Sequence, residues 1–396
     1  MHPVPATTKR LATVALAGLM VSTAAAQASR APAKERPPEL PAETLTVMPT
    51  VPSAERVYVA DIAIAHISDG RIRVFDARNG KLLGMISTGF AGNFALSPKA
   101  DELYVATTYL SRGSRGDRVD VLEVHDTASL AFKHEVVLPP KRAQALTYRG
   151  LVQPTASGRF AVVQNATPAT SLTVVDLQER KVAGEIATPG CWGAHASASQ
   201  AHRVSMLCGD GKVATVTLDD AGAVADRQVS DKLFDADRDA WFHHTDRVGD
   251  RYWFVSFKGN VTELDLGGPV AKVAGRSWSL AAAQAGGWRP GGYQAFAVHP
   301  SGRWLVVAMH DHGNEGSHKR PAKQLWVFDL DSGKRVSTAR GHGAVSVAFS
   351  RSGQRLHALN GETGALVIWQ WAGGVLKPLT TIQRAGESAL QVESQD

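Results

Sequence analysis

Residues 74–81 read V-F-D-A-R-N-G-K, and residues 327–334 read V-F-D-L-D-S-G-K. In both stretches a hydrophobic run ends at an aspartate, a turn follows, and a second run leaves after a lysine. Aspartate can hydrogen-bond its own backbone in such a turn, and glycine supplies a positive φ. Residues 174–181 repeat the arrangement as V-V-D-L-Q-E-R-K. The pattern predicts a strand–turn–strand unit that recurs along the chain.

Weaker copies of this turn extend the series. The seven anchor positions are 76, 126, 176, 219, 265, 329 and 370. Most intervals lie between 41 and 50 residues, and a period of that length with four short strands is typical of a β-propeller. Residues 44–396 provide about 50 residues for each of seven blades. We therefore predict an all-β, seven-bladed β-propeller over 44–396, with six or eight blades as alternatives.

Two features of the repeat bear on closure and binding. The segment 389–392 alternates as a strand should, and it can complete the first blade. The longest interval precedes Asp329 and holds two irregular insertions, 277–293 and 310–321. Insertions in a scaffold of this kind often carry binding, so these two loops are candidate interaction segments.

The first residues have the order of a secretory signal. Lys9 and Arg10 precede an apolar segment at 11–26, and small residues follow at Ala24–Ala26 and Ala26–Ala28. The apolar core is shorter than the roughly 20 residues of a membrane span, although a signal anchor remains the alternative. We expect a signal peptide at 1–28, a flexible Pro/Ala-rich arm at 29–43 and an exported protein in the periplasm, not in the membrane.

Composition excludes other classes. The chain has 396 residues, of which 44% are hydrophobic and 20% charged, as in ordinary globular proteins. The net charge of +6 is mild and the basic residues are scattered, so we expect no nucleic-acid partner. The two cysteines, Cys191 and Cys208, form an even pair in an exported chain, which favours a disulfide over two free thiols.

Recognisable catalytic motifs are absent. We find no G-x-S-x-G, Walker loop, G-x-G-x-x-G or H-E-x-x-H sequence. His310, His312 and His318 match no standard metal spacing, and His243-His244 point to opposite faces if they lie on a strand. We therefore predict no metal site and no catalytic residue in this chain. The residues by themselves indicate a propeller that binds something.

Several irregular peptides, taken in order, carry a family resemblance. They are GMISTGFAG (84–92), TTYLSRGSRGDRVDV (107–121), LPPKR (138–142), QNATPATS (164–171), PGCW (189–192), CGDG (208–211), WRPGGY (288–293), EGSHK (315–319) and ESALQV (387–392). In this order the chain resembles the heavy (large, α) subunit of the quinoprotein amine dehydrogenases. It resembles the aromatic amine (aralkylamine) kind more than the methylamine kind.

The resemblance implies a function shared between two kinds of subunit. Family members are periplasmic heterotetramers of two large and two small subunits, and the large subunit is a seven-bladed propeller. The Cys-rich small (light, β) subunit carries tryptophan tryptophylquinone, so no cofactor is expected in this chain. A primary amine is oxidised to an aldehyde and ammonia, and electrons pass to a blue copper protein of the azurin or amicyanin type.

The resemblance also assigns roles to single residues. Phe90 corresponds to the aromatic side chain that lines the substrate channel, although a plain blade-core phenylalanine is the alternative. Cys191 and Cys208 match the disulfide of the large subunit, and the insertions at 277–293 and 310–321 become candidates for the small-subunit interface. Two other functions stay open: a stand-alone exported binding propeller without catalytic activity, and a propeller hydrolase that acts alone.

Overall fold

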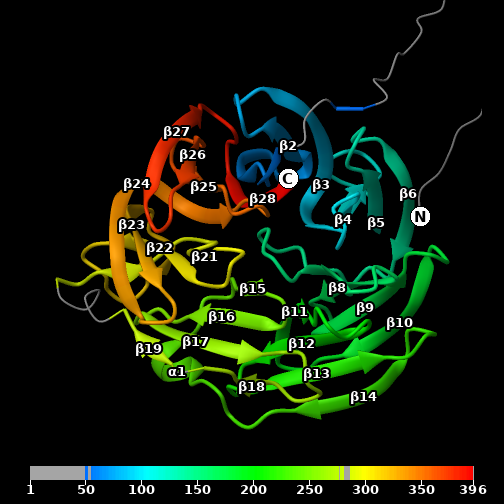
Figure 1. Cartoon of the computed structure of the whole chain (residues 1–396). Helices are drawn as coiled ribbons and strands as arrows, with labels where there is room; N and C mark the ends of the chain where they lie inside the picture. Colours follow the sequence, from blue (N-terminus) through cyan, green and yellow to red (C-terminus); the bar gives the residue numbers. More distant parts are fainter. Residues whose placement is uncertain (1–49, 52–54, 276, 281–285, 396) are drawn as a thin grey trace, which may run out of the picture. The chain divides into compact units, whose positions relative to one another are not determined.

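A computed structural model describes residues 50–51, 55–275, 277–280 and 286–395. The expected signal peptide and the Pro/Ala-rich arm lie outside these residues, as does part of the 277–293 insertion. The described part is all-β, and Figure 1 shows its sheets placed around a common centre. No helix among the described residues is both long and apolar enough to cross a membrane.

The first sheet joins the two ends of the described chain. Its order is β28-β1-β2-β3-β4-β5-β6. The strands are β1 (Arg56–Asp61), β2 (Gly70–Asp76), β3 (Leu82–Leu96), β4 (Glu102–Leu110), β5 (Arg118–Asp126), β6 (Phe132–Leu138) and β28 (Ala389–Gln395). In β28, Val392 lies opposite Val59 of β1 in an antiparallel register. The prediction that segment 389–392 completes the first sheet is confirmed.

Three smaller sheets follow along the chain. The second is β10-β9-β8-β7, the third is β11-β12-β13-β14, and the fourth is β15-β16-β17-β18 with β19 paired to β17. Their strands are β7 (Val152–Pro154), β8 (Phe160–Asn165), β9 (Ser171–Asp176), β10 (Lys181–Ala187), β11 (Cys191–Ala196), β12 (Arg203–Cys208), β13 (Val213–Leu218), β14 (Val224–Val229), β15 (Asp246–Val248), β16 (Arg251–Val255), β17 (Asn260–Asp265), β18 (Lys272–Val273) and β19 (Trp278–Ser279).

The fifth sheet has the order β20-β22-β23-β24-β25-β26-β27, and β21 pairs with β22. Its strands are β20 (Arg289–Pro290), β21 (Phe296–Val298), β22 (Trp304–His310), β23 (Ala322–Asp329), β24 (Lys334–Phe349), β25 (Arg355–Asn360), β26 (Leu366–Trp371) and β27 (Leu376–Ile382). The helical elements are η1 (Ile64–Asp69), α1 (Ala236–Asp239) and η2 (Ser317–Lys319).

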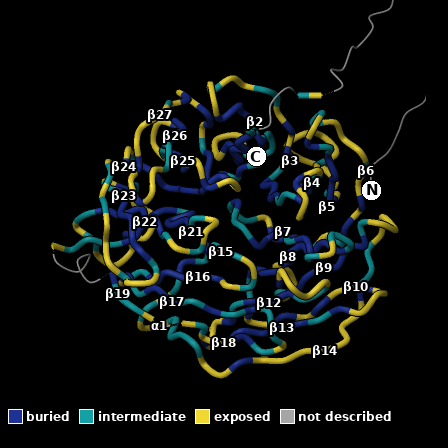
Figure 2. Tube along the Cα trace, viewed as in Figure 1, coloured by how far each residue is buried: buried dark blue, intermediate teal, exposed yellow. Residues whose placement is uncertain are grey.

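Middle strands are buried on both faces because each sheet packs against two neighbours. In β8, Phe160 and Val162 belong to a cluster with residues of the third sheet, such as Met206. Ala161 and Val163 point the other way and pack in a second cluster with residues of the first sheet. Outer strands face water instead, and every residue of β14 is exposed (Figure 2).

The aspartate turns form as the sequence predicts. The Asp176 carboxylate accepts hydrogen bonds from the main-chain N–H groups of Gln178 and Glu179, and Asp329 accepts one from Ser332. Arg180 occupies the position at which the turns at 74–81 and 327–334 have a glycine, and its φ is 54°. The hydrogen bonds of the aspartate therefore hold the turn even where a non-glycine residue must take the left-handed conformation.

Candidate functional site

Phe90 lies where β3 passes from one half of the first sheet to the other. It is the pairing partner of Thr108 in β4, and the register shifts between Phe90 and Asn93. The residues on either side, Gly89 and Ala91, have positive φ values of 50° and 49°. Phe90 is half-buried and belongs to none of the hydrophobic clusters found among the described residues. Its ring is therefore not part of the packed core.

Two glycines make this crossing possible. A Cβ atom on Gly89 would lie 2.7 Å from the Thr107 hydroxyl, and one on Gly92 would lie 2.4 Å from the main-chain oxygen of Thr88. Contacts that short exclude any side chain unless the backbone moves. The G-F-A-G peptide at 89–92 thus presents one large side chain, Phe90, between two glycine positions at which no side chain fits.

A buried arginine fixes the backbone on which Phe90 stands. The Arg142 guanidinium donates hydrogen bonds to the main-chain oxygens of Phe90 and Ala91, each at 2.9 Å, and to the Thr108 hydroxyl at 2.8 Å. Burial lowers the pKa of Arg142 to about 10, although the nearby Asp120 carboxylate opposes the shift. Arg142 therefore stays charged at neutral pH and holds the Phe90 crossing rigidly.

The two insertions predicted from the sequence lie against each other. The main-chain N–H of Gly313 donates to the main-chain oxygen of Gly287 at 2.6 Å, and the main-chain N–H of Gly292 donates to the main-chain oxygen of His318 at 2.8 Å. The ammonium of Lys319 lies 5.8 Å from the ring centre of Tyr293. Residues 286–293 and 310–321 therefore form one surface, whereas residues 281–285 of the first insertion lie outside the described part.

A group of aromatic rings, which sequence analysis missed, lies between separate sheets. Tyr148 contacts His243 edge-on at 5.2 Å between ring centres, and it lies 6.2 Å from Tyr293. Trp192 lies 6.5 Å from His243. All four side chains are half-buried. No local motif marks such a group, because its members come from segments far apart in the sequence.

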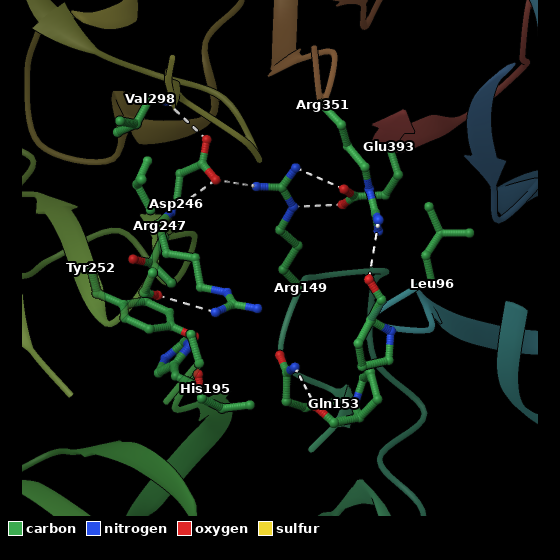
Figure 3. Close-up of a pocket in the computed structure, with 18 of the residues that line it drawn as sticks. Leu96, Arg149, Gln153, His195, Asp246, Arg247, Tyr252, Val298, Arg351 and Glu393 are labelled. Atoms are coloured by element: carbon green, nitrogen blue, oxygen red, sulfur yellow. Dashed lines mark hydrogen bonds and ion pairs between the residues drawn. The ribbon is translucent and has the colours of Figure 1, made fainter. Parts of the chain in front are cut away.

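A cavity of about 590 Å³ lies among the described residues, and inner strands of all five sheets contribute to its wall (Figure 3). Across it, Arg149 donates to both oxygens of Glu393, at 2.5 and 2.8 Å, and to Asp246 at 3.1 Å. Burial alone would lower the pKa of Arg149, but the two carboxylates outweigh it and hold the pKa above its ordinary value. This ion-pair network joins β28 to β15.

The predicted disulfide is present. Cys191 and Cys208 are directly opposite in β11 and β12, with their Cα atoms 3.9 Å apart, and their sulfur atoms are bonded. It links neighbouring strands of one sheet. Within the described ranges no group of three or more His, Cys, Asp or Glu side chains is placed to hold a metal ion.

Comparison with known proteins gives one consistent sequence match. The family model described as methylamine dehydrogenase heavy chain matches residues 53–392. The methylamine dehydrogenase heavy chain of Methylophilus methylotrophus is 26% identical over 381 residues, which cover 94% of this chain and 92% of that protein. The same subunit of Paracoccus versutus is 26% identical over 353 residues, covering 87% and 80%.

Solved structures with a similar fold are much less similar in sequence. A 6-phosphogluconolactonase-like protein from Bacteroides fragilis superposes with a TM-score of 0.60 at 12% identity, covering 87% of this chain and 98% of that one. The periplasmic gluconolactonase of Pseudomonas aeruginosa gives 0.59 at 17% identity, covering 86% and 99%. These two likenesses concern the propeller-like fold alone.

Proposed function

Because the chain belongs to the methylamine dehydrogenase heavy chain family, we propose that it is the large subunit of a periplasmic amine dehydrogenase dependent on tryptophan tryptophylquinone. The enzyme oxidises primary amines to aldehydes and ammonia. The observation that carries this proposal is the match along residues 53–392, together with relatives covered over most of their own length. The quinone belongs to a small, Cys-rich light subunit, and two large and two small subunits form the heterotetramer.

The fold proposal is a seven-bladed propeller. Strands β3 and β24 are long, and each pairs with one neighbour along its first half and with another along its second half. Near each change of partner the register shifts, between Phe90 and Asn93 in β3 and between Ala344 and Ser346 in β24. If each is divided between two blades, the first and fifth sheets supply two four-stranded blades each, and the other sheets supply one each. The inner strands of this arrangement are β28, the second half of β3, β7, β11, β15, β21 and the second half of β24.

In this arrangement the Phe90 crossing and the paired insertions lie at the same end of the inner strands. Phe90 begins the inner half of β3, and the 277–293 insertion leads into β21. Since β22 runs antiparallel to β21, the 310–321 insertion, which leaves the end of β22, returns to the start of β21. We propose that the light subunit sits on this end, against the paired insertions and the Tyr148 aromatic group.

The role proposed for Phe90 is to line the path of the amine toward the light subunit. The quinone, when the light subunit is bound, supplies the two-electron oxidation; this chain shapes the approach and excludes water. Phe90 suits that role because its ring is half-buried outside the core clusters and its backbone is held by Arg142. An aromatic substrate would gain from packing on it, which favours aromatic amines.

Electron transfer to a blue copper protein completes the proposal. The curated relatives are named as methylamine dehydrogenase heavy chains. Steady-state kinetics must therefore decide whether this enzyme prefers aromatic or short aliphatic amines.

The proposal that the protein is exported rests on the residue pattern of 1–28, which has the order of a signal peptide.

The test is purification of the native complex from a periplasmic fraction. We expect a small Cys-rich chain to co-purify with this one in equal amounts, with quinone absorbance that bleaches when a primary amine is added. Benzylamine, methylamine and a tertiary amine form the substrate panel, and the tertiary amine is the negative control. If this chain elutes alone and without visible absorbance, it is a stand-alone binding propeller instead.

A further inference from the structure

The central cavity opens at the other end of the inner strands from Phe90. Its wall includes Ser97, which follows β3, Thr155, which follows β7, and Ser350, which follows β24. Phe90, by contrast, begins the inner half of β3. A volume of about 590 Å³ is within the range of small-molecule sites. The cavity is therefore large enough for a ligand of its own.

Charge in the cavity is not balanced evenly. Both carboxylates, Glu393 and Asp246, are bound by Arg149, and Asp246 also accepts hydrogen bonds from the main-chain N–H groups of Arg247 and Val298. Neither carboxylate is left to attract a cation. The acidic groups of this wall are thus occupied by protein donors.

Arg247 has a different environment. Its guanidinium donates to the main-chain oxygen of Gly249 at 3.1 Å and lies 5.7 Å from the ring centre of Tyr252. No ion pair to Arg247 occurs among the described residues. Figure 3 shows its side chain extending from β15 toward the middle of the cavity, below Arg149. A charged donor therefore projects into the hollow without a carboxylate partner.

A buried histidine in the same wall adds an unused polar atom. His195 is only 2% exposed, and its Nε2 has no hydrogen-bond partner. The ring lies between Tyr252, at 5.6 Å, and Phe254, at 5.8 Å. Burial lowers the pKa of His195 to about 3, so the imidazole is neutral at physiological pH. A neutral ring can donate one hydrogen bond without adding charge.

We propose that this cavity binds a small oxyanion, a carboxylate or a phosphate, through the Arg247 guanidinium with a hydrogen bond from His195. Arg351, whose guanidinium donates to the main-chain oxygen of Pro98, is a further arginine of the same wall, beside Arg149 and Arg247. Arginine suits this task because its planar donors match both anions. The site does not depend on the light subunit or on amine oxidation, since all its groups belong to this chain.

Isothermal titration of the purified full complex with sodium phosphate and with sodium citrate tests the proposal. The buffer contains no other oxyanion, and xylitol serves as the uncharged control. We expect saturable binding of at least one anion and none of xylitol. Arg247→Gln should weaken that binding at least tenfold. Arg238→Gln should leave it unchanged, because Arg238 is 87% exposed on α1, outside the cavity wall.

The two anions also distinguish the two ligand classes: tighter binding of phosphate would indicate a phosphate ligand, and tighter binding of citrate would indicate a carboxylate ligand. The absence of saturable binding by either, or equal binding in Arg247→Gln, would overturn the proposal. A second variant, His195→Phe, replaces the ring by one of similar shape without nitrogen. We expect a severalfold loss of affinity with retained folding by circular dichroism; unchanged affinity would show that the Nε2 atom takes no part.

Discussion

Replacing Arg142 by methionine is the most direct test of how the Phe90 crossing is held. Methionine is unbranched and fills similar space, but it donates no hydrogen bond. The variant loses the donors to the main-chain oxygens of Phe90, Ala91 and Ala143 and to the Thr108 hydroxyl. Each bond from a charged donor contributes at least about 1.5 kcal/mol, so the four together contribute about 6 kcal/mol.

Part of this loss is recovered, because the variant no longer buries a guanidinium. Arg142 is only 2% exposed, so its desolvation is nearly complete. Relief of that cost offsets about half of the lost hydrogen bonding, which leaves a net destabilisation of about 3 kcal/mol. We expect a lower urea midpoint by tryptophan fluorescence with an unchanged m value. Hydrogen exchange should speed up first in the peptide covering 88–93.

The matched control is Arg115→Met, in an exposed turn of the same sheet. Arg115 is exposed, so its replacement should change the free energy of unfolding by less than about 0.5 kcal/mol. If Arg142→Met costs less than about 1 kcal/mol and exchange at 88–93 does not change, then the carbonyl groups have other partners and the reasoning is wrong.

Three further predictions concern the channel, the disulfide and pH. Phe90→Ala should lower the ratio of kcat/KM for benzylamine to kcat/KM for methylamine by about three- to tenfold. The control Phe132→Ala should leave this ratio unchanged, because Phe132 is 54% exposed on β6. If Phe90→Ala affects both amines equally, Phe90 has no role in selectivity. Cys191→Ser should lower the free energy of unfolding by about 3 kcal/mol with unchanged kcat, and two titratable thiols in the native protein would contradict the bond seen between Cys191 and Cys208. Burial lowers the pKa of His195 to about 3 and holds that of His244 well below its usual value. Because the unfolded chain then binds more protons below about pH 6.5, His195 should cost about 2 kcal/mol of stability between pH 7 and pH 5, and His244 should act in the same direction. Urea midpoints that stay constant over that interval would refute the neutral burial of these histidines.

The repeated turn was readable from the residues because its chemistry is local. An aspartate such as Asp176 or Asp329 bonds to main-chain groups two or three residues away, so the signal is contained in one short peptide. The closing strand was readable for a similar reason, since alternation at 389–392 predicts a strand wherever its partner lies. The cysteine pair needed only its even number and the expectation of export.

The surroundings of Phe90 could not be predicted in the same way. Arg142 lies 52 residues away in the sequence, and nothing near it indicates that its guanidinium bonds to the main chain of β3. The Tyr148 aromatic group and the Arg149 network share this property, since Arg149 pairs with Glu393 across 244 residues. Both insertions were recognised as candidates, but their mutual contact was not.

Local hydrogen bonding and strand periodicity were enough to indicate an all-β chain built from repeated turns, because both depend only on residues close together in the sequence. Which side chains share a cavity or hold the Phe90 crossing was settled only when the sheets packed around their centre. The physical reason is that buried polar groups must find partners wherever the folded backbone brings them. For Arg142, Arg149 and His195, those neighbours come from segments that no pattern in the sequence connects.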